Sequence, residues 1–174
     1  MDDVERLFRT YHATLVRYLT RRLGDRDWAE EVAQETFVRA LRQERLVNER
    51  AWLFAVATNL VRDEARKDVR RRRRLTLLRA EAEAVQAEAP AVEQSLERAH
   101  EAALARRALG SLAERDRLAL LMREEGLWYD EIASALSLSV GSVGTTLARA
   151  RRRLAESYEA LRGGRGESEG HAAS

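Results

Sequence analysis

The sequence predicts an all-α protein with two small helical domains joined by a linker. Residues that favour helices (Ala, Leu, Glu and Arg) dominate the 174-residue chain, β-branched residues are seldom clustered, and there is one proline, Pro90. Apolar residues recur at helical spacing on both sides of that proline. We expect a three-to-four-helix domain over residues 1–74, a linker over 75–92, a helix-turn-helix domain over 93–161 and a disordered tail over 162–174.

The first domain is expected to contain three main helices. The first has an apolar residue at every fourth position and ends near Gly24, a residue typical of helix C-termini. The second begins near Asp27, because Asp27 and Glu30 have the spacing of a capping box. The third begins near Glu49 and runs into the arginines at 70–74. The expected apolar positions are Leu7, Tyr11, Leu15, Leu19 and Leu23, then Trp28, Val32, Thr36 or Phe37, and Ala40 or Leu41, and finally Trp52, Val56 and Leu60.

Positive charge is concentrated between Arg62 and Arg79, although the formal net charge of the chain is only +2. A basic segment beside the aromatic residues Trp52 and Phe54 is typical of a surface that binds a nucleic-acid backbone and stacks on bases. The alternative is a structural role, in which the acidic stretch 80–101 folds back on the basic segment. The residues alone leave both interpretations open.

The second domain begins with a helix that ends at Gly110. Ser111 and Glu114 then have capping-box spacing, which predicts a helix through Met122, and Gly126 ends that helix.

Residues 129–147 have the pattern of a helix-turn-helix. The inner face is expected to consist of Ile132, Ala133, Leu136, Leu138, Val143 and Leu147. Ser139 stands where the second helix needs an N-cap. The side chains expected to face outward, toward base edges and phosphates of a major groove, are Ser142, Thr145, Thr146 and Arg149, with Arg151, Arg152 and Arg153 beyond them. The alternative is a helical hairpin with a solvated polar face.

The composition argues against several kinds of site. No cysteine is present, which excludes disulfides, Fe–S clusters and thiolate zinc sites. The acidic start Met1-Asp2-Asp3 lacks the apolar core of a signal peptide, and no apolar run approaches the roughly 20 residues that a membrane helix needs. We therefore expect a cytoplasmic protein without membrane insertion.

The chain also offers little for catalysis. It has three histidines, and neither a Gly-rich phosphate loop nor a nucleophile with a base is visible. Glu97 and His100 form one Glu-x-x-His pattern, whereas a di-metal carboxylate bundle needs two such patterns. We expect a protein that is not an enzyme and that holds no metal ion or cofactor.

Three sequence blocks in the same order resemble the sigma-70 family of transcription initiation factors. Residues 27–40 are similar to the family's acidic helix, residues 51–60 to the helix beside the minus-10 element, and residues 129–154 to its helix-turn-helix. The resemblance covers about residues 4–160, and the two-domain form is similar to the extracytoplasmic-function subfamily. It implies binding to core RNA polymerase, through the β′ clamp coiled coil and the β flap, to promoter DNA, and to an anti-sigma factor.

The resemblance also implies roles for particular residues. The polymerase-binding residues would be Glu31, Gln34, Glu35 and Val38. The residues that hold minus-10 DNA would be Arg45, Asn48, Asn59, Arg62 and Arg66. The residues that contact minus-35 DNA would be Ser139, Ser142, Thr145, Thr146, Arg149 and Arg152.

The chain departs from the family pattern in the helix-turn-helix. The family usually has Gly where Ser137 stands, and often Lys or Arg where Gly144 and Thr146 stand.

The alternative function is a helix-turn-helix regulator that binds DNA without polymerase.

Overall fold

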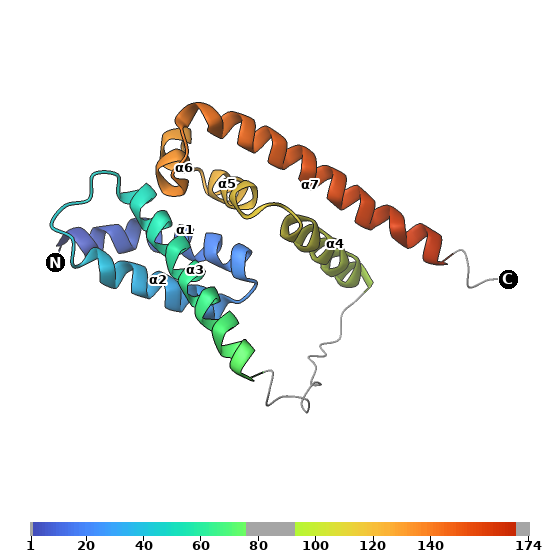
Figure 1. The fold of residues 1–174 in the computed structure, drawn as a ribbon, viewed down its shortest axis with the longest axis horizontal. Helices are drawn as coiled ribbons and strands as arrows, with labels where there is room; N and C mark the ends of the chain where they lie inside the picture. The colour runs from blue at the N-terminus through green and yellow to red at the C-terminus, as the bar shows by residue number, and fades with distance from the viewer. Residues whose placement is uncertain (1, 76–92, 170–174) are drawn as a thin grey trace. The chain divides into compact units, whose positions relative to one another are not determined.

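The computed structural model describes residues 2–75 and 93–169. Within these two ranges every regular element is an α-helix (Figure 1). The helices are α1 (Asp2–Leu23), α2 (Arg26–Ala40), α3 (Glu49–Leu75), α4 (Glu93–Gly110), α5 (Glu114–Glu124), α6 (Tyr129–Leu136) and α7 (Val140–Glu169). The predicted all-α fold class is confirmed. The linker was predicted at 75–92; Leu75 is the last residue of α3, and 76–92 lie outside the described residues.

The described residues form two compact units. The first contains residues 2–75 and 121–143, and the second contains residues 93–120 and 144–169. Residues 121–143, which the sequence pattern assigns to the second domain, therefore belong to the first compact unit, where α6 packs against α3. The border between the units falls inside α5 and inside α7.

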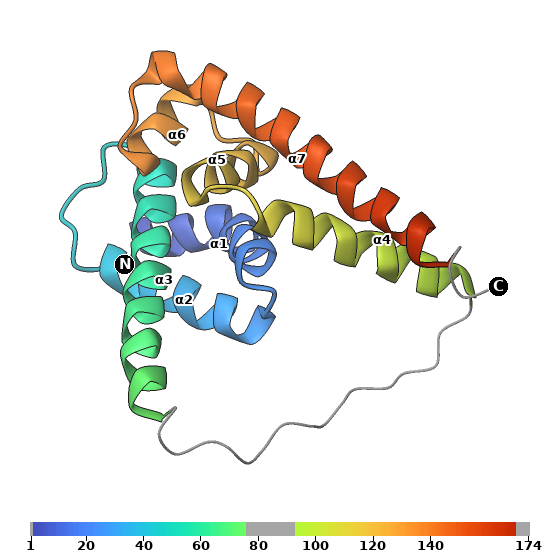
Figure 2. The same cartoon turned by 45° about the vertical axis from the view of Figure 1, so that its right-hand side comes forward.

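The core of the first unit lies where α1, α2 and α3 pack against one another (Figure 2). Tyr18 of α1 is fully buried, and its ring centroid lies 4.9 Å from that of Phe54 on α3. The Tyr18 hydroxyl is also 2.8 Å from the Thr58 hydroxyl, so the buried polar groups satisfy each other. Burial raises the pKa of Tyr18, which keeps the phenol neutral in the core.

The start of α2 differs from the predicted one. The helix begins at Arg26, and its N-cap is Asp25, whose carboxylate accepts a 3.0 Å hydrogen bond from the backbone N–H of Trp28. Asp25 has an extended backbone, which brings its side chain back over the first turn. The prediction of a capping box on Asp27 was therefore wrong by two residues, whereas Gly24, with a φ of +71°, ends α1 as expected.

The buried face of α3 is wider than the predicted stripe. Leu60 is buried as expected, but Trp52 and Val56 are only half-buried. The residues that carry the core are Ala51, Leu53, Phe54, Ala57, Leu60 and Val61. Because α3 packs against α1, α2 and α6, more than one side of the helix is covered. The interpretation of Phe54 as a base-stacking residue was wrong, since Phe54 is fully buried.

The loop before α5 uses Ser111 differently from the prediction. The Ser111 hydroxyl donates to the Ala108 carbonyl at 2.6 Å and lies 2.8 Å from the Ser157 hydroxyl of α7. It therefore binds the end of α4 and does not cap α5, which begins at Glu114. Gly126, with a φ of +83°, follows the end of α5 as predicted.

The helix-turn-helix consists of α6, a tight turn and the start of α7. Ile132, Ala133, Val143 and Leu147 are buried, as the pattern predicts. The turn passes through Ser137, which has the left-handed conformation (φ 55°, ψ 46°). In the turn, the backbone N–H of Leu138 donates to the Ala133 carbonyl at 2.8 Å. This is the geometry in which a glycine is normally preferred.

The end of α7 also differs from the prediction. The helix continues to Glu169, although the sequence predicts a disordered tail from residue 162. Gly163, Gly164 and Gly166 each disfavour a helix by roughly 1 kcal/mol relative to Ala, so helix propensity does not explain the extension.

The strained turn gives a first prediction. Replacing Ser137 with Gly is expected to raise the free energy of unfolding by about 1 kcal/mol, because the left-handed conformation strains a residue with a Cβ atom. Urea denaturation followed by circular dichroism measures this change. The matched control is Ser134→Gly on the exposed face of α6, where glycine should lower stability by roughly 0.5 kcal/mol. Equal effects of the two substitutions would contradict the assignment of strain to the turn.

Candidate nucleic-acid and protein interfaces

The predicted polymerase-binding residues form one exposed row on α2. The buried side of α2 is formed by Ala29, Val32, Ala33, Thr36, Phe37 and Ala40. Glu31, Gln34, Glu35 and Val38 are all exposed, and their spacing of three or four residues places them together on the other side. We call these four residues the α2 stripe. The stripe contains two carboxylates, one amide and one apolar side chain. It is therefore complementary to a partner surface that is basic and that also offers an apolar residue for Val38 to contact.

A basic row runs along the exposed side of α3. Asn59 and Arg66 are exposed and Arg62 is half-buried, and their spacing places them on one side of the helix. The Arg62 guanidinium lies 3.4 Å from the Asn59 side-chain oxygen, and Arg66 lies 4.0 Å from Asp63. We call Asn59, Arg62 and Arg66 the α3 row. The side chains of the arginines at 70–74 lie outside the described residues.

The other two predicted minus-10 residues precede α3 in the chain. Asn48 caps the helix, since its side-chain oxygen accepts a hydrogen bond from the backbone N–H of Ala51 at 3.3 Å. Arg45 is exposed in the loop before it. At 1.5 Å per residue, Asn48 and Asn59 are about 16 Å apart along the helix axis. The structure therefore brings together the α3 row, while Arg45 and Asn48 form a separate group at the start of α3.

The helix-turn-helix exposes most of the residues predicted to contact DNA, but not all of them. Ser139, Thr145 and Arg152 are exposed, and Ser142 is half-buried. Thr146 is only 3% exposed, because it lies on the side of α7 that also buries Val143 and Leu147. The prediction that Thr146 faces outward was therefore wrong.

The start of α7 is held by the backbone of Ser139. Both the N–H and the hydroxyl of Ser142 donate to the Ser139 carbonyl, at 3.1 and 2.8 Å. These bonds give Ser139 a structural role through its carbonyl, in addition to the predicted role of its hydroxyl.

Arg149 does not extend freely into solvent. Its guanidinium donates two hydrogen bonds to Asp116 of α5, at 2.9 Å from Nε and 2.6 Å from Nη2. The Asp116 side chain is 2% exposed, and Arg153 lies 3.8 Å from the same carboxylate. The hydrogen bonds from Arg149 hold the pKa of Asp116 below its ordinary value, and the pKa of Arg149 is raised. Arg149 therefore braces the recognition helix from its inner side, whereas Arg152 remains exposed.

Two further clusters in the first unit have no signal in the sequence, because their partners are distant in the chain. Arg50 of α3 donates from Nε to Glu131 of α6 at 2.9 Å. Burial disfavours the charged form of Glu131, but hydrogen bonds from Arg50 and from the Trp128 N–H outweigh it and lower the pKa of Glu131. The second cluster joins Arg17 and Arg21 of α1 to Glu125. The spacing of these residues in the sequence does not predict either cluster.

The described part of the chain contains no group of three or more His, Cys, Asp or Glu residues that could hold a metal ion. None of its helices is long and apolar enough to cross a membrane.

These features together define a class of protein: an all-helical protein with a helix-turn-helix, an exposed acidic row on α2 and a basic row on α3. Comparison with family models narrows the class. The model of sigma-70 region 2 matches residues 7–73, and the model of sigma-70 region 4 matches residues 102–154. The chain belongs to the sigma-70 family of RNA polymerase sigma factors, in its extracytoplasmic-function group. It is thus a factor that acts with RNA polymerase in promoter-specific initiation, and the alternative of a polymerase-independent regulator is set aside.

Individual relatives support this assignment over most of the chain. RNA polymerase sigma factor YlaC of Bacillus subtilis (strain 168) is 32% identical over 160 residues, which cover 88% of this chain and 90% of that protein. ECF RNA polymerase sigma factor SigE of Mycolicibacterium smegmatis is 32% identical over 88% of this chain and 61% of that protein. Among solved structures, the sigma factor RpoE from Bartonella quintana, crystallised with the anti-sigma factor NepR, has a similar fold. Its TM-score is 0.65 at 20% identity, over 91% of this chain and 98% of that one.

Proposed function

We propose that this sigma factor docks on core RNA polymerase through the α2 stripe, which would contact the β′ clamp coiled coil. All four residues of the stripe are exposed on one side of α2, and none is needed for the core. Glu35 is restrained by Arg39, which lies 2.9 Å away on the next turn. An ordered carboxylate on a rigid helix can pair with a basic partner at little entropic cost.

The α3 row is the surface proposed for the opened minus-10 strand. Its guanidinium groups can contact phosphates, and the Asn59 amide can hydrogen-bond to a base edge. Arg45 and Asn48, at the start of α3, would hold a base that leaves the stack. Unstacking a base costs a few kcal/mol, and contacts with the protein must compensate for this cost. Attraction between the positive charge of the α3 row and the DNA phosphates supplies part of the compensation.

The helix-turn-helix is proposed to contact the minus-35 element through Ser139, Ser142, Thr145 and Arg152. Hydroxyl groups can donate to or accept from base edges, and Arg152 can contact a phosphate. Thr146 is left out because it is buried, and Arg149 would act by holding α7 in place through Asp116. By analogy with the family we further propose contact with the β flap, regulation by an anti-sigma factor and a cytoplasmic location.

The observation that carries the proposal is the separation of charge in the first unit, with an exposed acidic stripe on α2 and an exposed basic row on α3. In vitro transcription with core polymerase and a genomic DNA library, with transcript starts mapped, identifies a promoter for further tests. On that promoter, the double variant Arg62→Ala and Arg66→Ala should bind polymerase normally but lower open-complex formation at least about tenfold. The salt dependence of binding to an opened fork template should also flatten, because each lost phosphate contact lowers its slope.

The matched control is Arg9→Ala, which removes an exposed arginine of α1 outside both surfaces. It should leave open-complex formation unchanged. Normal open complexes with the double variant would refute the role of the α3 row, and an absence of transcripts from every template would refute the proposed function as a whole.

A further inference from the structure

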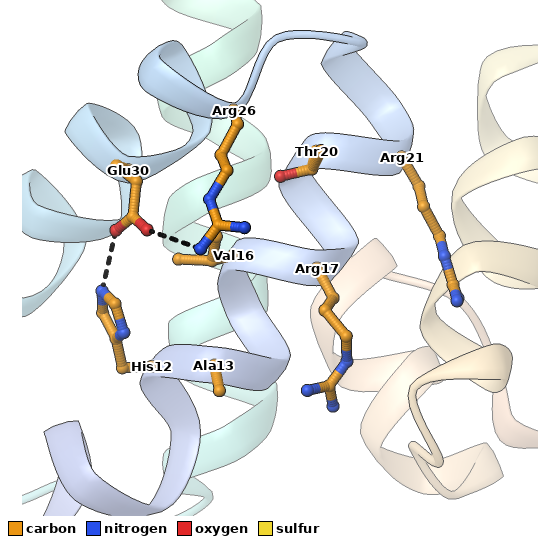
Figure 3. Close-up of a pocket in the computed structure, with 8 residues that line it drawn as sticks. All are labelled: His12, Ala13, Val16, Arg17, Thr20, Arg21, Arg26 and Glu30. Atoms are coloured by element: carbon orange, nitrogen blue, oxygen red, sulfur yellow. Dashed lines mark ion pairs between the residues drawn. The ribbon is translucent and has the colours of Figure 1, made fainter. Parts of the chain in front are cut away.

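A polar groove lies between α1 and α2, on residues that the proposed function does not use (Figure 3). Its volume is about 460 Å³. Small or apolar side chains of α1, among them Ala13 and Val16, line it together with three arginines. Arg17 and Arg21 extend from α1 and Arg26 extends from α2. The groove therefore combines apolar contact area with a strongly positive edge.

The structure shows which chemical group the arginines of α1 bind. The carboxylate of Glu125 sits between them, with one oxygen 3.1 Å from Arg17 and the other 3.2 Å from Arg21. The Glu125 side chain is only 4% exposed, whereas those of Arg17 and Arg21 are 55% and 45% exposed. Arg17 and Arg21 thus form a seat for one carboxylate, and both still have donors that face solvent.

The remaining charges leave the groove positive. Glu30 is its one acidic side chain, and it is paired with His12 at 3.1 Å and with Arg26 at 3.8 Å. Arg26 is nevertheless 77% exposed, so its guanidinium is open to a second partner. An acidic ligand that enters the groove would meet three arginines and one carboxylate that is already neutralised by its neighbours.

These observations favour a protein ligand over a nucleic acid. The apolar residues along α1 match apolar side chains of a peptide and have no equivalent on a phosphate backbone. The Arg17–Arg21 seat already holds a glutamate side chain, so its geometry suits a carboxylate carried by a protein. We propose that the groove binds an acidic, amphipathic helical segment of a partner protein. The segment's carboxylates take the place of Glu125 on Arg17 and Arg21 and extend to Arg26.

The test measures binding of a defined probe to the full-length protein. The probe is a fluorescein-labelled helical peptide with Glu at positions i and i+4 and Leu between them, and the control peptide has Gln in place of Glu. Fluorescence anisotropy should show binding of the Glu peptide only. The double variant Arg17→Ala and Arg21→Ala should bind it at least about tenfold more weakly, a loss of about 1.4 kcal/mol. The control Arg9→Ala and Arg42→Ala, which removes equal charge at exposed positions outside the groove, should bind normally.

Substitution of Glu125 distinguishes ligand binding by Arg17 and Arg21 from a purely structural role of these two arginines. Because its carboxylate competes for the same two arginines, Glu125→Gln should raise the affinity for the Glu peptide at least about fivefold. Glu124→Gln, at the exposed neighbouring position, should not change it. Circular dichroism checks that each variant is folded.

Four outcomes would overturn the proposal, three of them in the peptide assay. These are no binding of the Glu peptide at millimolar concentration, no gain with Glu125→Gln, and an equal loss with both arginine double variants. If double-stranded DNA displaces the peptide and itself requires Arg17 and Arg21, the groove is a nucleic-acid site and the proposal is wrong. Each of these results would leave the transcription assays of the proposed function unaffected, so the two can fail separately.

Discussion

Reversing the charge of the α2 stripe, with Glu31→Lys and Glu35→Lys together, is expected to weaken binding to core RNA polymerase at least about a hundredfold. Two attractive contacts would become two repulsive ones, and like charges facing each other across an interface cost several kcal/mol. Both side chains are exposed, so the fold should be retained. Affinity is measured by fluorescence anisotropy with labelled sigma factor, and the fold by circular dichroism.

The matched control reverses two exposed acidic residues of the same unit that lie outside the stripe, with Glu5→Lys and Glu44→Lys. This variant carries the same change in net charge and should keep its affinity within about threefold, because only long-range electrostatics change. If the stripe variant kept its full affinity for polymerase, the α2 stripe would not be the polymerase-binding surface.

Replacing Arg149 with Ala is expected to lower the free energy of unfolding and to shift the urea midpoint clearly downward. The substitution would leave the buried Asp116 carboxylate with only the 3.8 Å contact to Arg153, and an unpaired buried charge is costly. The double variant Asp116→Ala and Arg149→Ala should lose less, because no charge is then left buried. Urea denaturation of the two variants measures the difference.

Arg152→Ala is the matched control, since it removes an exposed arginine one turn away. It should leave stability nearly unchanged. In a plot of the logarithm of minus-35 affinity against the logarithm of salt concentration, it should reduce the steepness of the slope by about 1, the value for one lost phosphate contact. Arg149→Ala should leave that slope unchanged. The opposite result, a flatter slope with Arg149→Ala, would show that Arg149 contacts DNA and does not serve as a brace.

The same ion pair predicts a pH dependence. The pKa of Asp116 is lower in the folded protein than its ordinary value of 3.8, so its ionised form favours folding above about pH 4. That stability is lost as the pH falls from about 4 through the folded pKa. Thermal unfolding between pH 2.5 and 6 should therefore show a steeper acid loss for the natural protein than for Asp116→Asn.

Features that depend on neighbouring residues could be predicted from the sequence. Helical spacing predicts that the four residues of the α2 stripe share one side of the helix, and all four are exposed; their polymerase-binding role was implied by the family resemblance. Four of the six residues predicted for the inner face of the helix-turn-helix are buried, because Ile132, Ala133, Val143 and Leu147 form a local pattern; Leu136 and Leu138 are half-buried. Cap positions were less certain, since Asp25 and Asp27 both lie at the start of the helix and only the backbone angles decide between them.

Features that depend on distant residues could not be predicted. Arg149 has the spacing of an outward-facing residue, but Asp116, thirty-three positions earlier, draws it inward. Thr146 has a polar side chain at a position that packing makes buried. For the same reason α3 buries more than one stripe, because a helix with several neighbours has no single inner face.

Substitutions at the Asp116–Arg149 ion pair and substitutions on the outer side of α7 are expected to have different effects. The ion pair anchors the recognition helix from its inner side and involves neither Ser142 nor Thr145. In the proposed function these two residues contact the minus-35 element, so exchanging them in related proteins would change promoter preference while the anchoring pair is kept. Divergence of DNA preference within such a lineage should be concentrated at those positions, while the anchoring pair stays constant.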